Sequence, residues 1–230
     1  MKKIALFISL TFFVILSLFS GNIEYQIDIN SNYIWRGFDL NPSHKLVVQP
    51  SVTLSVGSSG FGLNIWSSFS FENKRANELD FTLFYNFKTG EDFTLSAGFI
   101  HYGWYFIKDF KFKDNTTQEV YVSIGFPNFL FSPEVSIYYD FNNGKGLYIL
   151  SSLGYSLKLS DEYVADISAS VGYNGGQWID KSGLSDINFS LAIPLKFGKI
   201  DLTPSVNYTF VLLNQVSVDN HFWVGVSVVF

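Results

Sequence analysis

The charged side chains of this sequence concentrate on one face of segments in which every second residue is apolar. Alternate residues of a β-strand point to the same side of a sheet, so side chains spaced in this way would line one common surface. Rings of Asp and Glu favour cations in channels. If these segments are strands that close into a barrel, the charged face lines its interior, and we predict a polar, cation-leaning lumen. The same charges could instead pair across a narrow lumen and hold it shut. The predicted lumen residues are Glu24, Asp28, Arg36, Glu78, Asp80, Glu119, Glu134, Lys158, Asp166, Lys196 and Asp201.

Arg36 is the most distinctive of these residues, because it ends a predicted strand on the lumen side. Gly37 follows it and permits a tight turn or a positive φ. A guanidinium fork at this position could narrow the outer mouth or bind an anionic solute. Buried charges also require partners, so Arg36 could instead be a structural counter-ion for the lumen carboxylates. The sequence leaves both roles open.

Catalytic and metal-binding residues are sparse. A hydrolase requires a nucleophile with a base within hydrogen-bond reach, and none of His44, His101 and His221 has a Ser at a spacing typical of barrel lipases or deacylases. The chain has no Cys and no pair of His at ligand spacing, so we expect no metal and no other cofactor. We predict that the protein is not an enzyme. A lipid-modifying enzyme, the alternative, would need His101 or His221.

Alternation of apolar and polar residues extends over most of the chain and predicts an all-β fold. From Tyr163 to Tyr173, for example, apolar residues at odd positions alternate with Asp, Ser and Gly at even positions. A slip of one residue would reverse every side chain, so this pattern specifies the register. About twelve such segments are expected, at 22–35, 46–56, 61–71, 78–87, 92–105, 117–126, 131–140, 146–158, 163–173, 187–197, 200–211 and 220–230.

The apolar face of these segments favours a membrane barrel over a soluble sandwich or lipocalin-like barrel. It contains no Asp, Glu, Lys or Arg, and a hydrocarbon solvent requires this, since an Arg or Lys on the lipid face costs about 2–4 kcal/mol at mid-bilayer. Strand edges have no water to bond to in a bilayer, so the sheet must close. We therefore predict a transmembrane antiparallel up-and-down β-barrel. Aromatic residues at its strand ends would form interfacial girdles: Tyr33, Trp35, Phe61, Phe87, Phe93, Phe126, Tyr139, Tyr163, Tyr173 and Phe197.

Connections between the segments alternate in length. Those at 57–60 and 198–199 are short, whereas those at 106–116 and 174–186 are long. Outer-membrane barrels have short periplasmic turns and longer outer loops. Because an even number of strands places both ends at one rim, we expect Phe230 and the start of the barrel to face the periplasm.

Residues 1–20 are predicted to be a signal peptide, and residues 21–230 the barrel. Lys2 and Lys3 precede an apolar run over 4–18, which small residues follow; a single anchoring helix is the alternative. Loss of the two lysines changes the net charge from −5 to −7. Nucleic-acid binding is not expected, because phosphates require clustered Lys and Arg.

Two motifs resemble a known family. Ser31-Asn-Tyr-Ile-Trp-Arg-Gly37 is followed by Gln49-Pro50 and by Gly60-Phe-Gly-Leu-Asn-Ile-Trp-Ser67. They are similar to the Tyr-x-x-Arg-Gly and Gly-Phe-x-x-x-x-Trp-x-Ser signatures of the TorF-type porin family, and the resemblance continues through 78–105. It implies an outer-membrane β-barrel with no defined substrate.

Taken together, these patterns predict a porin-like channel of the bacterial outer membrane for passive diffusion of small solutes or ions. Its expected partners are outer-membrane lipid, the small solutes, and the barrel-assembly machinery, which would bind the C-terminal strand ending at Phe230. The alternative is a non-conducting structural or interaction barrel, in which a loop such as 174–186 binds a partner at the cell surface.

Overall fold

The computed structural model describes residues 21–42, 45–71, 75–103 and 116–230. The predicted signal peptide at 1–20, His44 and most of the predicted loop at 106–116 lie outside these ranges.

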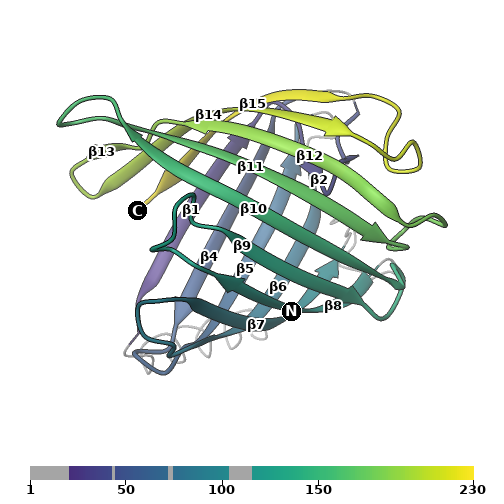
Figure 1. Cartoon of the computed structure of the whole chain (residues 1–230), viewed down its shortest axis with the longest axis horizontal. Helices are drawn as coiled ribbons and strands as arrows, with labels where there is room; N and C mark the ends of the chain where they lie inside the picture. The colour runs from purple at the N-terminus through teal and green to yellow at the C-terminus, as the bar shows by residue number, and fades with distance from the viewer. Residues whose placement is uncertain (1–20, 43–44, 72–74, 104–115) are drawn as a thin grey trace, which may run out of the picture.

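The described chain forms one closed antiparallel β-barrel (Figure 1). Each strand pairs with its neighbour in the chain, and the ring closes where β1 pairs with β15. The predicted up-and-down barrel of about 12 strands is therefore confirmed. Its strands are β1 (Ile23–Asn30), β4 (Val47–Ser55), β5 (Phe61–Ser70), β6 (Arg75–Phe87), β7 (Thr94–Gly103), β8 (Thr116–Gly125), β9 (Glu134–Asp140), β10 (Gly146–Lys158), β11 (Val164–Gly175), β12 (Gly183–Ala192), which the short β13 (Leu195–Phe197) continues, β14 (Ile200–Val211) and β15 (His221–Val229).

Polar side chains fill the inside of the barrel and apolar side chains cover its outside. On β9, Ser136 and Asp140 are buried, whereas Val135, Ile137 and Tyr139 between them are exposed. Among the described side chains, 18 buried residues are polar or charged and only 5 are hydrophobic, the reverse of a soluble core. This distribution suits a hydrocarbon solvent outside the barrel. None of the described residues forms a helix that is long and apolar enough to span a membrane.

Connections at the two rims differ in length. The turns at 56–60, 159–163 and 198–199 lie at the same rim as the carboxyl end, on the left in Figure 1. The longer connections at 31–46 and 212–220 lie at the opposite rim. Short turns face the periplasm in such barrels, so we call the first rim periplasmic and the second the outer rim.

The first predicted strand is too long. β1 ends at Asn30, and residues 34–39 instead form a separate hairpin of β2 (Ile34–Trp35) and β3 (Phe38–Asp39). The chain turns because Arg36 and Gly37 both adopt a positive φ, of 52° and 83°, which no strand accommodates. Tyr33 and Trp35 therefore do not belong to the lipid-facing girdle, and Arg36 lies at a hairpin tip rather than at the end of β1.

The predicted strand at 187–197 also differs from the structure. β12 begins earlier, at Gly183, and the ladder is interrupted after Ala192 before β13 resumes it. Pro194 lies in this gap, and a proline has no N–H to donate to a ladder.

A substitution at Leu83 tests which face of β6 contacts lipid and which faces the lumen. It lies on the lipid side of β6 and is 57% exposed. We expect Leu83→Arg to lower the free energy of unfolding in lipid vesicles by about 2–4 kcal/mol. Thr82→Arg, one residue away on the lumen face, is the matched control and should cost much less. Equal losses for the two variants would contradict the assigned faces.

Candidate functional site

The β2–β3 hairpin lies inside the barrel near the outer rim, and its tip determines the geometry of the site. The backbone N–H of Leu40 donates to the carbonyl of Tyr33 at 2.9 Å, which closes the hairpin. A Cβ at Gly37 would lie 2.9 Å from Cγ1 of Val216 and 3.1 Å from Cβ of Asp186. Both the positive φ and this close approach therefore require glycine after Arg36.

Arg36 reaches across the lumen to β8 and forms a buried ion pair with Glu119. Its Nη1 lies 2.7 Å from Oε2 of Glu119 and its Nη2 lies 2.8 Å from Oε1, so the contact is bidentate. Gln177 completes the group, since it accepts from Nη1 at 2.6 Å and donates to Oε2 of Glu119 at 2.6 Å. Tyr102 also donates to Glu119, at 3.0 Å. The side chains of Arg36 and Glu119 are only 8% and 0% exposed.

Three aromatic rings surround the guanidinium. Its Cζ lies 4.6 Å from the ring centroid of Trp35, 4.3 Å from that of Tyr138 and 4.6 Å from that of Tyr148. Cation–π contacts of this kind stabilise a desolvated cation. Burial alone would lower the pKa of Arg36, but the nearby Tyr102 and Glu119 outweigh it and raise this pKa above its usual value. Arg36 is thus held as a cation.

Tyr33 attaches the hairpin segment to a second wall of the barrel. Its hydroxyl hydrogen-bonds to Glu78 on β6, and its ring lies 5.7 Å from that of Trp66 on β5. Burial first, and the charge of Glu78 second, raise the pKa of Tyr33 well above its usual value. Tyr33 is therefore a neutral phenol that donates to the carboxylate.

Five buried carboxylates lie at the same end of the barrel. Asp80 accepts from the backbone N–H of Gly103 at 3.1 Å, and Asp140 accepts from the hydroxyl of Thr117 at 2.7 Å. Asp186 accepts from the hydroxyl of Ser185 at 2.6 Å and from that of Tyr148 at 3.1 Å. We call this group, which consists of Glu78, Asp80, Glu119, Asp140 and Asp186 together with Arg36, the outer belt.

The outer belt brings together four of the predicted lumen residues: Arg36, Glu78, Asp80 and Glu119. The structure does not gather the other seven into one cluster: Asp28 lies near the outer end of β1, and toward the periplasmic rim lie Glu24, Glu134, Lys158, Asp166, Lys196 and Asp201. Lys158 pairs with Asp161 of the adjacent turn at 2.7 Å, and Lys196 lies 3.9 Å from Asp201. Their pore-lining role stays a prediction.

Sequence reasoning missed Asp140, Asp186, Gln177 and the aromatic residues around Arg36. Alternation on β9 places Asp140 in register with Ser136 and Tyr138, so this residue could have been found. Asp186 falls in the predicted loop at 174–186, because nothing in the local alternation indicates that β12 begins as early as Gly183. Nothing local in the sequence indicates that Gln177 meets Arg36, from which it is 141 residues distant.

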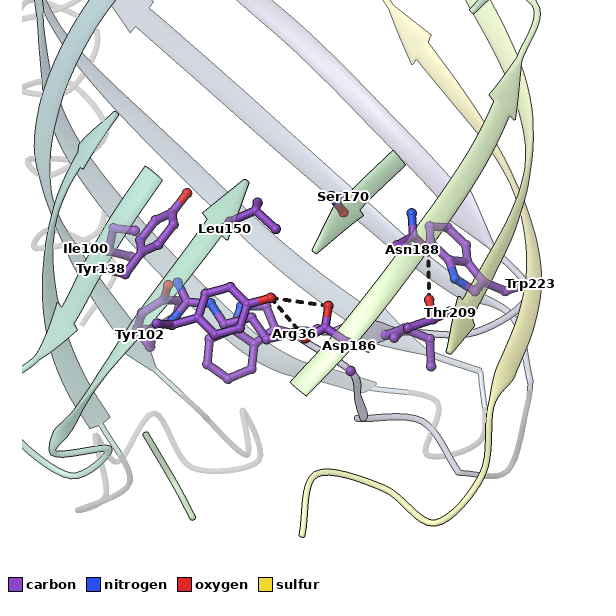
Figure 2. Close-up of a pocket in the computed structure, with 14 residues that line it drawn as sticks. Arg36, Ile100, Tyr102, Tyr138, Leu150, Ser170, Asp186, Asn188, Thr209 and Trp223 are labelled. Atoms are coloured by element: carbon purple, nitrogen blue, oxygen red, sulfur yellow. Dashed lines mark hydrogen bonds between the residues drawn. The ribbon is translucent and has the colours of Figure 1, made fainter. Parts of the chain in front are cut away.

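A cavity of about 390 Å³ adjoins the hairpin tip within the lumen (Figure 2). Arg36, Trp35, Tyr138, Tyr148 and Asp186 form one side of it. Its remaining lining includes Ile100, Leu150, Ser170, Asn188, Thr209 and Trp223. We call it the lumen cavity.

A closed barrel with a polar inside and an apolar outside is a membrane β-barrel of the outer-membrane type. The chain belongs to the family described as "Bacterial protein of unknown function (Gcw_chp)", whose model matches residues 19–230. A search of curated proteins finds no sequence match. The protein is therefore a bacterial outer-membrane barrel.

Solved structures of outer-membrane proteins are similar to the chain in fold. The KdgM porin has a TM-score of 0.57 at 16% identity, covering 89% of this chain and 96% of that one. An outer membrane channel from Pseudomonas putida F1 has a TM-score of 0.56 at 11% identity, over 92% and 95% of the two chains. Outer membrane phospholipase A from Escherichia coli has a TM-score of 0.50 at 16% identity, over 91% and 90%. Since both porins and an enzyme share the fold, the fold alone does not assign the chemistry.

The two described histidines, His101 and His221, each contact a polar side chain of the barrel. Nδ1 of His221 lies 3.9 Å from Oδ2 of Asp39, but its Nε2 has no hydrogen-bond partner in the part of the chain that the structure describes. His101 contacts the side-chain nitrogen of Gln118 at 3.0 Å. The described residues also contain no group of three His, Cys, Asp or Glu that could hold a metal ion.

Glu119→Gln tests how the hairpin is held. Removing one partner of a buried ion pair costs about 3–5 kcal/mol, because the other charge stays buried. We expect trypsin to cleave the detergent-purified variant after Lys45, within the segment that contains the hairpin, about 100-fold faster than the native protein. The double variant Arg36→Met/Glu119→Gln removes both charges and should be cleaved more slowly than the single variant.

Asp161→Asn is the control for this experiment. It breaks the exposed Lys158–Asp161 pair, and such pairs contribute little to stability. An unchanged cleavage rate in Glu119→Gln would show that the ion pair does not hold the hairpin.

Proposed function

We propose that the protein is an outer-membrane channel for passive diffusion of small solutes or ions, with a lumen that prefers cations. Small residues face the lumen on β10 and β11 in its periplasmic half, and this observation carries the proposal. Ser152 pairs with Ser170, and Gly154 pairs with Ser168, on the lumen faces of β10 and β11. A Cβ at Gly154 would meet no atom within 4 Å. The lumen beside these strands is thus open. In narrow barrels of about eight strands, by contrast, side chains fill the interior.

The charge balance of the outer belt supports cation preference. Five buried carboxylates face one arginine there, and Arg36 is already paired with Glu119. Carboxylate rings favour cations in channels. These carboxyl groups outnumber the arginine where a solute entering from outside would pass.

The comparisons agree with this proposal. KdgM, whose fold is similar, is a porin and has been solved in complex with disordered oligogalacturonate. The residues that resemble the TorF-type porins, Tyr33, Arg36, Gly37 and Trp66, lie together at the hairpin and its contacts. The motif thus corresponds to one structural unit, the narrow part of the proposed channel.

A non-conducting barrel is the second candidate, because the β2–β3 hairpin occupies the outer mouth. Arg36 spans from the hairpin to Glu119 on β8, and Tyr33 joins it to Glu78 on β6. A hairpin held at both walls could close the lumen. Conductance that is absent from the native protein and arises in Glu119→Gln, which loosens the hairpin, would favour this candidate over a constitutively open channel.

The C-terminal strand is the proposed contact for the barrel-assembly machinery. Phe230 is exposed at the periplasmic rim, where its ring lies 5.9 Å from that of Tyr25 on β1. β15 also closes the barrel, so a factor that binds this strand could act before closure.

Single-channel recording tests the channel directly. We expect discrete conductance steps in planar bilayers, and a reversal potential that indicates cation preference in a KCl gradient. Glu78→Gln with Asp80→Asn removes two belt carboxylates and should lower the cation-to-anion permeability ratio. Asp92→Asn, in an exposed periplasmic turn, should leave that ratio unchanged. Correctly folded protein without discrete conductance would contradict the proposal.

A further inference from the structure

The charged groups beside the lumen cavity are already engaged with the barrel wall. The edge of the Arg36 guanidinium is bound by Glu119 and Gln177, and aromatic rings lie against it. A solute anion thus finds the guanidinium fork occupied. Asp186 accepts from Tyr148 and Ser185, so its carboxylate is likewise engaged.

The groups that remain for a solute are neutral and polar. Thr209 donates to Oδ1 of Asn188 at 2.8 Å, and Figure 2 shows the amide nitrogen of Asn188 directed away from this contact. Nε1 of Trp223 has no hydrogen-bond partner among the described residues. Buried polar atoms nearly always have a hydrogen-bond partner. The unpartnered N–H of Trp223 therefore indicates that an acceptor is missing at this point of the cavity wall. Ser170 adds a hydroxyl.

These groups combine donors and acceptors with apolar surface. Asn188 offers an N–H donor, Trp223 has a second, buried N–H beside the cavity, and the hydroxyls of Ser170 and Thr209 can also accept. Ile100 and Leu150 supply aliphatic surface beside the ring of Trp223. A sugar has the same composition, since its hydroxyls both donate and accept and its C–H faces are apolar.

We propose that the lumen cavity is a binding subsite for a neutral, polyhydroxylated solute of the size of a mono- or disaccharide. Its volume of about 390 Å³ lies within the range of small-molecule sites. The two charged residues that line the cavity, Arg36 and Asp186, are already engaged by protein partners, so the groups left for a solute are neutral ones. The inference rests on the proposed function, because it names the class of solute that the channel would pass.

Current blockade by maltose, a neutral probe, tests the proposal on the full chain in planar bilayers. Maltose should reduce the ionic current in a saturable way, whereas gluconate and glucosamine, an anion and a cation of comparable chemistry, should do so more weakly. Asn188→Ala should weaken the maltose blockade about tenfold, the loss of roughly one hydrogen bond. Asn64→Ala, on β5 outside the cavity lining, should leave the blockade unchanged.

Tryptophan fluorescence separates this inference from the channel proposal. Maltose should change the fluorescence of the detergent-solubilised protein, and Trp223→Phe should remove most of that change while Trp178→Phe preserves it. A conducting protein with neither blockade nor a fluorescence change would overturn the subsite and leave the channel standing. A fluorescence change without any conductance would support the subsite and overturn the channel. Stronger blockade by gluconate or glucosamine would overturn the assignment to neutral solutes.

Discussion

Every backbone N–H and C=O group that lies in hydrocarbon must bond to another part of the chain. In this protein the requirement is met by a sheet without edges, in which β1 pairs with β4 on one side and with β15 on the other. Closure then separates two solvents, so each strand must carry apolar side chains outside and polar ones inside. The alternation of the sequence, the exposed apolar surface and the polar lumen all follow from this single constraint.

The lumen imposes a second requirement, because its charges are removed from bulk water and need partners. Near the periplasmic rim, exposed pairs such as Lys158 and Asp161 retain contact with water. Near the outer rim the carboxylates are buried, and each is held by hydroxyls, backbone N–H groups or Arg36. The anionic-solute role considered for Arg36 is thereby disfavoured, and its role as a counter-ion is supported, since Glu119 occupies the guanidinium fork.

Much of the fold could be predicted from the sequence, because one face of every strand contacts lipid and this contact excludes charge. The same alternation placed Glu78, Asp80 and Glu119 on the lumen side. The prediction from alternation is wrong after Asn30. Tyr33 and Trp35 keep the apolar spacing of β1, although the chain has turned into the lumen there. Periodicity reports which residues share a face and does not report a change of direction. The contact between Arg36 and Glu119 joins residues 83 positions apart, and no local pattern encodes such a distance.

The hairpin also has a place in the order of folding. Arg36 belongs to the connection between the first two barrel strands, yet its partners are Glu119 on β8 and Gln177 after β11. Contacts between residues so distant in the chain carry a large loop-closure entropy and form late. The ion pair can therefore assemble only when strands from both halves of the chain already stand opposite one another. Its formation marks a nearly complete barrel, so the mouth acquires its final shape at the end of folding.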